Sequence, residues 1–510
     1  MAPTPVELHA VASRQPTATA LVVTADRVPI SYRNLVRLVE DLAEELLRAG
    51  LSQGDRVALR AHSDAAYVVG LFAALHAGMV AVPLDPALPV ADQHARVLAA
   101  GARAVLVGEP AGTGELTLPC WPISVTPGRH DSTASVELDV TAAPQPPAPP
   151  PEGLSRDDAL IMFTGGTTGS PKMVPWTRDN IAGSIGSVVD TYRLGPQDAT
   201  VAAMPLFHGH GLIAALLSTL ASGGAVLLPA GGRFSARTFA ADLGTVGATW
   251  FTAVPTIHRI LLARAATDHL GCQRGRLRFI RSCSAALDTK TAQTLRTEFD
   301  APVLSAFGMT EATHQATSMR LDEKTAATPG LVGSSTGPEI RIVGDDGRIC
   351  PPGSVGELQL RGRTVVRGYL DNPAATAQNF TDGWLHTGDL GSLSAARELT
   401  LRGRIKELIN RGGEKISPEH VEDVLAGHPD IAEAAVFGVP DPIYGETVAA
   451  VIVPRAPAAP TPAELTGFCR ERLAAFEVPE SIQLSDELPH TAKGSVDRRA
   501  VAERFGPEAE

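Results

Sequence analysis

One loop organises this chain: Phe163-Thr164-Gly165-Gly166-Thr167-Thr168-Gly169-Ser170-Pro171-Lys172. It follows the apolar run 159–163, which predicts a buried strand. Glycine lets the backbone approach an anion closely, and successive N–H groups can then surround the anion, with hydroxyls and a lysine beside them. The stretch therefore favours a polyphosphate-binding loop, and the simpler alternative is a flexible surface loop. It is not a Walker loop, because the spacing G-x-x-x-x-G-K-[ST] is absent.

Composition narrows the class of protein. The chain has 510 residues, of which 44% are hydrophobic and 20% charged, as in a soluble enzyme with several domain-sized units. The net charge of −12 argues against nucleic-acid binding, so an anionic ligand must be held by a local group of residues. The five cysteines are scattered and form no C-x-x-C pair, which favours reduced thiols in a cytoplasmic protein. The N-terminus lacks the pattern of a signal peptide, and no apolar run is long enough to predict a membrane span.

Strand and helix patterns alternate along the first part of the chain. Residues 32–49 and 65–77 predict helices, and residues 56–59 and 80–84 predict strands, so we expect an α/β fold of parallel sheets with flanking helices. Further strand candidates follow at 225–228, 249–251, 277–280 and 302–304. A Pro-rich spacer at 143–152 is expected to be extended and exposed.

The pattern changes twice toward the C-terminus. Residues 330–400 carry short, glycine-rich segments and predict a small β-rich subdomain. Residues 404–510 hold helix and strand patterns of their own, for example 421–425 and 449–453, and predict a small, mobile α+β domain. We therefore divide the chain into a large domain, 1–403, and a small domain, 404–510.

Several other stretches carry residues suited to chemistry. Phe307-Gly308-Met309-Thr310-Glu311 follows a predicted strand, where an aromatic face suits a base and a carboxylate suits Mg²⁺. Asp389 follows a glycine and could accept the hydroxyls of a ribose, or it could be an ordinary turn residue. The run 402–415 is rich in cations and glycine and lies at the predicted domain boundary. In the run 204–211, two histidines beside an aromatic residue suit a pocket wall better than a metal site.

In this order, these stretches resemble the adenylate-forming ligases, a superfamily of acyl-CoA synthetases, luciferases and peptide-synthetase adenylation domains. The resemblance runs from Tyr32 to Arg499. It is greatest to oxalate–CoA ligases, and the runs that carry this likeness are 204–212, 253–258, 279–285, 309–314 and 406–418.

The resemblance implies a role for each candidate residue. The phosphates of ATP would be held by the loop residues Thr164, Gly165, Gly166, Thr167, Thr168, Gly169 and Lys172. The nucleoside would be bordered by Ser284, Ala285, Phe307 and Gly308, with its ribose held by Asp389 and Arg404. Thr310 would contact the α-phosphate and Glu311 the Mg²⁺, while His208 and His314 would edge the acid pocket. Lys406 would be the hinge, and Gly413 would line the path of the pantetheine arm of CoA.

The chain departs from the family pattern near its end. The stretch is Thr491-Ala492-Lys493-Gly494-Ser495-Val496-Asp497-Arg498-Arg499, and Ser495 stands where the family has a lysine that reaches the acid and the α-phosphate. Losing one such charge typically costs about 10²–10³ in rate. There are three explanations. Lys493 could substitute for the missing lysine through a shifted loop, the enzyme could adenylate an unusual acid slowly, or the chain could have drifted to other chemistry.

The resemblance implies an ATP-dependent, Mg²⁺-requiring ligase that forms an acid adenylate and then the CoA thioester of a small, polar acid. The acceptor stays open between CoA, a carrier protein and an amine. One alternative is a relative that activates nitrite to diazotise an aryl amine, and another is a nucleotide-binding pseudoenzyme. The sequence does not give the acid or the oligomeric state.

Overall fold

The computed structural model describes residues 8–23, 25–108, 116–128, 134–164, 171–265, 273–321, 328–455, 457–458, 460–490 and 496–506. The loop candidates Gly165, Gly166, Thr167, Thr168 and Gly169 lie outside this part of the chain, as do Lys493 and Ser495.

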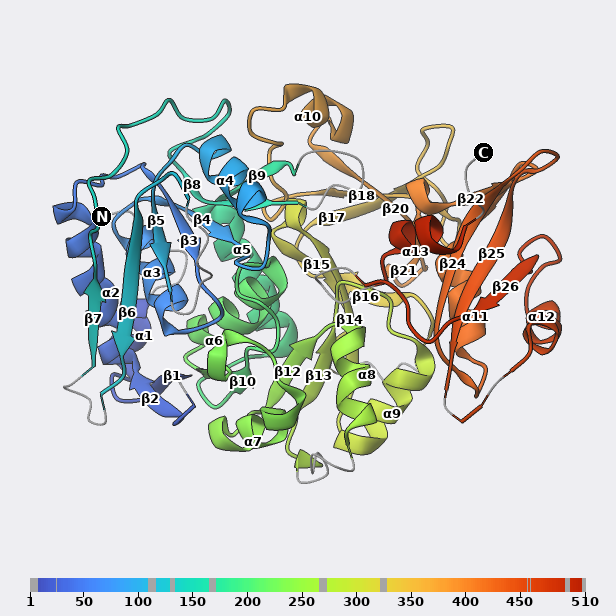
Figure 1. Cartoon of the computed structure of the whole chain (residues 1–510), viewed down its shortest axis with the longest axis horizontal. Helices are drawn as coiled ribbons and strands as arrows, with labels where there is room; N and C mark the ends of the chain where they lie inside the picture. Colours follow the sequence, from blue (N-terminus) through green and yellow to red (C-terminus); the bar gives the residue numbers. More distant parts are fainter. Residues whose placement is uncertain are drawn as a thin grey trace.

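A seven-stranded sheet forms the N-terminal part of the molecule, in the order β7-β6-β5-β3-β4-β8-β9 (Figure 1). Its strands are β3 (Arg56–Arg60), β4 (Val80–Leu84), β5 (Ala102–Val107), β6 (Cys120–Thr126), β7 (Ser135–Leu138), β8 (Asp158–Phe163) and β9 (Met173–Thr177). The five inner strands are parallel, and each edge strand is antiparallel to its neighbour. Alternate residues of β3 pack into different cores, Val57 with helix α3 (Ala65–His76) and Ala58 with α4 (Val90–Ala99), so both faces of the sheet are covered.

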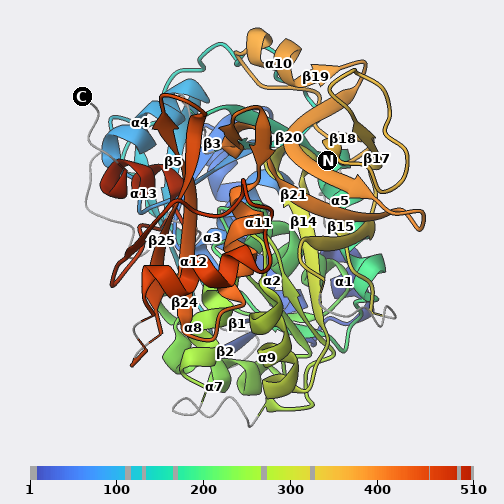
Figure 2. The same cartoon turned by 90° about the vertical axis from the view of Figure 1, so that its right-hand side faces the viewer.

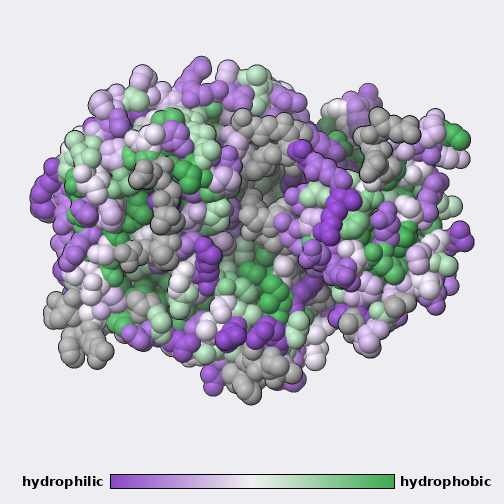
Figure 3. All heavy atoms as spheres, viewed as in Figure 1, coloured by the Kyte–Doolittle hydropathy of each residue, from purple (hydrophilic) through white to green (hydrophobic). Residues whose placement is uncertain are grey.

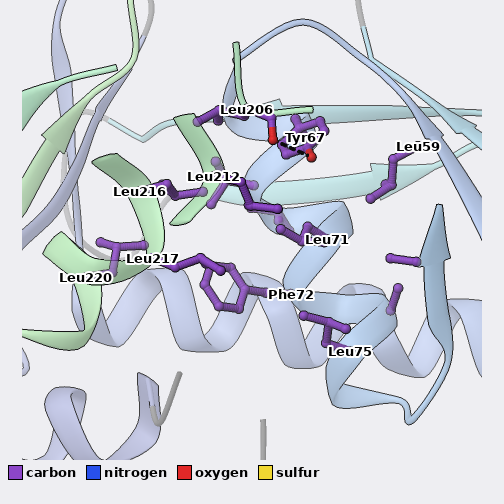
Figure 4. Packing of buried hydrophobic residues seen from close by; sticks show 14 of the residues in the cluster. Leu59, Tyr67, Leu71, Phe72, Leu75, Leu206, Leu212, Leu216, Leu217 and Leu220 are labelled. Carbon is purple, nitrogen blue, oxygen red and sulfur yellow. Dashed lines mark hydrogen bonds between the residues drawn. The ribbon is translucent and has the colours of Figure 1, made fainter. Parts of the chain in front are cut away.

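The largest core holds the segment 204–211 in place. It contains side chains from α2 (Tyr32–Arg48), α3, α5 (Arg178–Tyr192) and the π-helix η1 (His210–Leu217). Figure 4 shows Tyr67 and Phe72 of α3 among leucines of η1, with the Tyr67 hydroxyl donating a hydrogen bond of 2.9 Å to the Leu206 carbonyl. A Cβ on Gly211 would lie 2.3 Å from the Pro205 carbonyl oxygen, so this tight turn into η1 requires glycine.

A four-stranded sheet and a ten-stranded sheet form the middle of the molecule. The smaller sheet contains β10 (Ala199–Val201), β11 (Ala225–Leu227), β1 (Thr19–Val23) and β2 (Val28–Ser31). The larger sheet contains β12 (Trp250–Ala253), β13 (Phe279–Ser282), β14 (Val303–Met309), β15 (His314–Ser318), β16 (Leu331–Ser335), β17 (Glu339–Val343), β18 (Gly356–Arg361), β19 (Phe380–Thr381), β20 (Trp384–Leu393) and β21 (Glu398–Arg404). The remaining helices of this part are α1 (Leu8–Arg14), α6 (Ser218–Ala221), α7 (Ala236–Val246), α8 (Pro255–Ala263), α9 (Thr289–Phe299) and α10 (Pro373–Asn379).

The region 330–400 is β-rich, as predicted, but its strands do not form a sheet of their own. The parallel strand β14 pairs antiparallel with β15, and β15 pairs with β16. The later strands therefore extend the sheet that begins with β12. The physical reason is that β14 continues beyond the predicted 302–304 to Met309 and offers its free edge to β15.

The last part of the chain has its own sheet and core (Figure 2). Its elements are β22 (Ile409–Arg411), β23 (Glu414–Ile416), α11 (Pro418–Ala426), β24 (Ile431–Asp441), β25 (Gly445–Pro454), α12 (Pro462–Arg470), β26 (Ser481–Leu484) and α13 (Arg498–Phe505). Ion pairs connect it to the rest, with 2.8 Å between Lys415 Nζ and Asp345 Oδ2 and 3.6 Å between Arg259 Nη1 and Glu433 Oε1.

The predicted fold class is confirmed in its sheets, its flanking helices and its α+β C-terminal part. The Pro-rich stretch 143–152 has no helix or strand and is mostly exposed. Arg103 Nε of β5 and Arg56 Nη2 of β3 hold it to the seven-stranded sheet by donating to the carbonyls of Gln145 and Ala148. No helix among the described residues is long and apolar enough to cross a membrane. Figure 3 shows hydrophilic side chains over much of one face, with hydrophobic ones in scattered groups.

Candidate active site

Three parallel strands end side by side and define the site. Register pairs Ala253 of β12 with Ser282 of β13, and Ser282 with Ser305 of β14. The segments that follow these strands therefore emerge together, which is the usual ligand position in such sheets. Ser284 and Ala285 come directly after β13 and are exposed there, and Ser284 has a positive φ of 74°.

The ends of the phosphate-loop candidate are held by a strand pair. β8 enters the loop and β9 leaves it, and the Thr164 N–H donates to the Lys172 carbonyl at 3.1 Å. Lys172 Nζ lies 4.5 Å from the ring centroid of Tyr369. The Tyr369 hydroxyl in turn donates to Glu311 Oε1 at 2.9 Å. The loop lysine and the predicted metal ligand are thus joined through one aromatic side chain, which the sequence did not identify.

Glu311 and Thr310 form a single 3₁₀ turn, η4 (Thr310–Ala312), at the end of β14. The Trp176 indole N–H fixes this turn to β9 by donating to the Thr310 carbonyl at 2.8 Å. Burial and the neighbouring Glu311 carboxylate raise the pKa of Tyr369, so its hydroxyl remains a donor. Glu311 Oε2 makes no hydrogen bond with the described residues. One carboxylate with a free oxygen beside a phosphate loop fits Mg²⁺, which binds through few carboxylates together with phosphate oxygens.

Phe307 and Gly308 lie just before this turn, in the part of β14 that pairs with β15. Phe307 is buried, and it packs in the core of the antiparallel part of the sheet. A Cβ on Gly308 would lie 1.5 Å from the His314 carbonyl oxygen, so only glycine permits this close pairing.

The predicted ribose pair, Asp389 and Arg404, is directly opposed across β20 and β21. Arg404 Nε donates to Asp389 Oδ1 at 2.9 Å. Asp389 Oδ2 is buried and has no hydrogen-bond partner in the described part of the chain. Burial raises the pKa of Asp389 to about 6, against the opposing effect of Arg404. An orphaned, buried acceptor of this kind fits the hydroxyl of a ligand.

The acid-pocket candidates lie beside His210, the second histidine of the run 204–211. The rings of His210 and His314 stack with centroids 5.2 Å apart, and His210 Nδ1 lies 3.1 Å from Ser284 Oγ. The predicted His208 is half-buried, and its ring lies 4.8 Å from that of Phe207. His210 therefore connects His314, a candidate for the acid pocket, with Ser284, a candidate for the nucleoside site.

Arg281 lies behind these histidines and is fully buried in β13. Its Nη1 and Nη2 atoms lie 3.2 and 3.1 Å from Nε2 of His210 and His314. Its other partners are the side chains of Thr252, Gln315, Tyr192 and Cys283. None of these partners is a carboxylate. The sequence signal for this residue was an arginine directly after the apolar pair Phe279-Ile280.

Lys406 and Gly413, the predicted hinge and a predicted residue of the CoA path, are exposed. Lys406 lies in the 3₁₀ turn η5 (Ile405–Glu407), where the chain passes from β21 to β22. Gly413 forms the turn between β22 and β23, and a Cβ there would meet no described atom within 4 Å. The observed structure thus leaves Gly413 apart from the clusters described above.

Two family models match this chain, the AMP-binding enzyme model over residues 8–370 and the AMP-binding enzyme C-terminal domain model over residues 420–495. The chain belongs to the AMP-binding enzymes. It is 41% identical over 505 residues to an oxalate–CoA ligase of Arabidopsis thaliana, covering 98% of each chain. It is 38% identical over 378 residues to a sulfoacetate–CoA ligase of Cupriavidus necator, covering 74% of this chain and 72% of that one.

A solved structure is also similar to this chain. ATP-bound MatB from Rhodopseudomonas palustris superposes with a TM-score of 0.83 at 28% identity, covering 98% of this chain and 99% of MatB. These likenesses confirm the expected adenylate-forming superfamily and an acid-activating, AMP-forming ligase of the acid–CoA ligase type.

Proposed function

We propose that this AMP-binding enzyme activates a small acid that carries a second anionic group, with oxalate as the first candidate, and transfers its acyl group to CoA. The observation behind this choice is Arg281, which has no carboxylate among its side-chain partners in the described part of the chain. A buried cation without a carboxylate costs several kcal/mol, so such a site favours a ligand that brings negative charge. Oxalate and sulfoacetate, named in two of its relatives, are both small acids of this kind.

In the first half-reaction, a carboxylate oxygen of the acid attacks the α-phosphorus of ATP. A P–O bond to the acid forms, the P–O bond to the β-phosphate breaks, and pyrophosphate leaves. Two anions approach each other in this step, so fixed positive charge and oriented donors are needed. We assign the β- and γ-phosphates to the loop residues Thr164, Gly165, Gly166, Thr167, Thr168, Gly169 and Lys172.

Three further side chains act at the reacting phosphate. Thr310 contacts the α-phosphate, and Glu311 holds Mg²⁺, with Tyr369 orienting its carboxylate through the hydrogen bond to Oε1. Mg²⁺ held there by Glu311 would supply positive charge against the phosphates and the leaving pyrophosphate. Lys493 supplies the cation that Ser495 lacks, and His208 borders the acid.

The nucleoside lies across the ends of the parallel strands. Ser284 and Ala285 border the adenine, with Phe307 and Gly308 as its other wall. Asp389 accepts the ribose hydroxyls through its free Oδ2, while Arg404 fixes its Oδ1.

In the second half-reaction, the thiol of CoA attacks the acyl carbon, the C–O bond to the phosphate breaks and AMP leaves. The small domain, residues 404–510, turns about Lys406 between the two steps, so that Gly413 lines the path of the pantetheine arm. Closure in each position excludes water from a reactive adenylate.

A substrate screen tests this proposal. Purified enzyme with ATP, Mg²⁺ and CoA is given oxalate, sulfoacetate, acetate, glycolate, benzoate or nitrite with an aryl amine, and pyrophosphate, AMP and thioester are measured. When a buried polar group of the site pairs with a group of the substrate, an analogue that lacks this group has a much lower kcat/KM. We therefore expect kcat/KM for oxalate to exceed that for acetate by about 10²-fold or more. Equal turnover of acetate or benzoate, or AMP formation only with nitrite and the amine, would contradict the proposal.

A further inference from the structure

The guanidinium of Arg281 restricts the chemistry of two imidazoles. It has only N–H donors and cannot accept a hydrogen bond. Its contacts with Nε2 of His210 and of His314, at 3.2 and 3.1 Å, are therefore hydrogen bonds only if both Nε2 atoms carry a lone pair. An imidazolium has no such lone pair.

Thr252 strengthens the case for His210. Its Oγ1 lies 3.1 Å from Arg281 Nη1 and 2.6 Å from His210 Nε2. With Nε2 of His210 as the acceptor from Arg281, the threonine oxygen accepts from the arginine and gives its own hydroxyl proton to the same nitrogen. In this arrangement Nε2 faces two donors, and the ring proton is on Nδ1. Nδ1 then donates to Ser284 Oγ at 3.1 Å, which leaves the serine hydroxyl proton free for a ligand.

The same argument applies to His314, whose Nε2 accepts a hydrogen bond from Arg281 Nη2 and whose proton is therefore on Nδ1. Its Nδ1–H finds no acceptor among the described residues. Tyr192 completes the arrangement from α5, because its hydroxyl accepts from Arg281 Nε at 2.9 Å and fixes the guanidinium plane.

We propose that Arg281 is a positioning residue that holds His210 and His314 as neutral imidazoles with the proton on Nδ1, so that the acid pocket presents hydrogen-bond donors to an anionic acid. This inference rests on the proposed acid-activating function of the pocket. Arg281 is fully buried behind the two rings and acts through them.

The surroundings keep both imidazoles neutral. Burial, and then the positive charge of Arg281, lowers the pKa of each histidine. The other titratable groups facing the cluster are His208, His258, Cys283 and Tyr192, so no carboxylate of the described residues stands beside the two rings to favour imidazolium. Acid binding should consequently not depend on titration of these two rings between pH 6 and pH 8, where an ordinary histidine titrates.

Nitrogen-15 NMR of the full chain without ligand tests the tautomers directly. Histidine-labelled enzyme is recorded at pH 6 and pH 8, and the two rings are assigned by the signals lost in His210→Asn and His314→Asn. We expect both wild-type rings to give the signals of the neutral Nδ1–H tautomer at both pH values. Imidazolium or Nε2–H signals would overturn the inference. Because no acid is present, this outcome is independent of the proposed function.

Kinetics then test the role of Arg281. With oxalate as the acid, we expect Arg281→Gln to raise KM for oxalate by about tenfold or more at pH 8, since a charge-assisted hydrogen bond is lost. The increase should be smaller at pH 6, where freed imidazoles become protonated, and KM for ATP should stay unchanged. Arg281→Lys, which keeps the charge, should recover much of the loss.

Arg278, three residues before Arg281 in the sequence, offers a matched control. It also lies beside β13, but it pairs with the Asp198 carboxylate at 2.6 Å. Arg278→Gln should leave the pH dependence of KM for oxalate as in the wild type. An increase in KM for Arg281→Gln that is the same at pH 6 and pH 8 would show a merely structural role and overturn the inference.

Discussion

Asp389 is a carboxylate whose ionisation should control nucleotide binding. Its folded-state pKa is raised to about 6 by burial, so it gains a proton as the pH falls through about 6 and then accepts hydroxyls poorly. We predict that KM for ATP rises as the pH is lowered from 7.5 to 5. Asp389→Asn should raise KM for ATP by about tenfold at pH 7.5, through loss of a charged acceptor, and should flatten this dependence. Steady-state kinetics at saturating acid measure both effects.

Asp179 is the control for this substitution. It is exposed, and its Arg363 partner lowers its pKa. Asp179→Asn should retain the wild-type KM for ATP at every pH. Wild-type behaviour of Asp389→Asn would contradict the assigned role.

The sequence predicted most of the grouping of site residues but not the cluster behind them. Thr164 and Lys172 are joined at one loop because β8 and β9 pair, and Asp389 meets Arg404 because β20 and β21 pair. Arg281 was missed because its burial depends on Thr252, His210 and Gln315, which come from separate segments. No local pattern encodes such a meeting.

At the scale of elements, the pairing of β14 with β15 positions Phe307, Thr310 and Glu311. Gly308→Ala would place a methyl group 1.5 Å from the His314 carbonyl oxygen and must break this pairing. We predict a loss of at least about 3 kcal/mol in the free energy of unfolding, as for other forced overpacking of backbone. Urea unfolding followed by circular dichroism measures it.

Gly186 provides the opposite case in α5. It has no positive φ, and a Cβ there would meet nothing within 4 Å. Gly186→Ala should therefore stabilise the protein by about 0.5–1 kcal/mol, since alanine is the better helix former. A mild effect of Gly308→Ala, similar in size to this one, would show that the pairing is not needed.

The individual elements could be predicted because their periodicity is local. Examples are the helix at α2 and the strands at β3, β4 and β8, which match the expected ranges closely. The continuity of the ten-stranded sheet could not be predicted, because it depends on hydrogen bonds between β14 and β15 across a single turn.

At the scale of the whole molecule, the account assigns the two half-reactions to two positions of the small domain. Lys493→Ala should slow pyrophosphate–ATP exchange by about 10²–10³, because one charge at the transition state is lost. It should leave CoA-dependent release of AMP from preformed adenylate nearly unchanged. Gly413→Trp should slow CoA-dependent release of AMP and leave pyrophosphate–ATP exchange nearly unchanged. The reason is that residue 413 is exposed in the observed position and lines the CoA path only after the small domain has rotated. Rapid mixing separates the two rates.

The control for Lys493→Ala is Ser495→Ala. It removes no charge and should change neither the pyrophosphate–ATP exchange rate nor the rate of CoA-dependent AMP release appreciably. Equal slowing of both half-reactions by Lys493→Ala and by Gly413→Trp would contradict the assignment of one step to each position.

Oxygen transfer tests the central claim, attack of the acid on the α-phosphorus, most directly. Oxalate labelled with ¹⁸O at every oxygen is turned over with ATP, Mg²⁺ and CoA, and the phosphorus products are analysed by mass spectrometry. The account predicts one ¹⁸O atom in each AMP and none in pyrophosphate, since the attacking oxygen stays on phosphorus when the thiol displaces it from carbon. Unlabelled AMP, or ADP with ¹⁸O in inorganic phosphate, would contradict it.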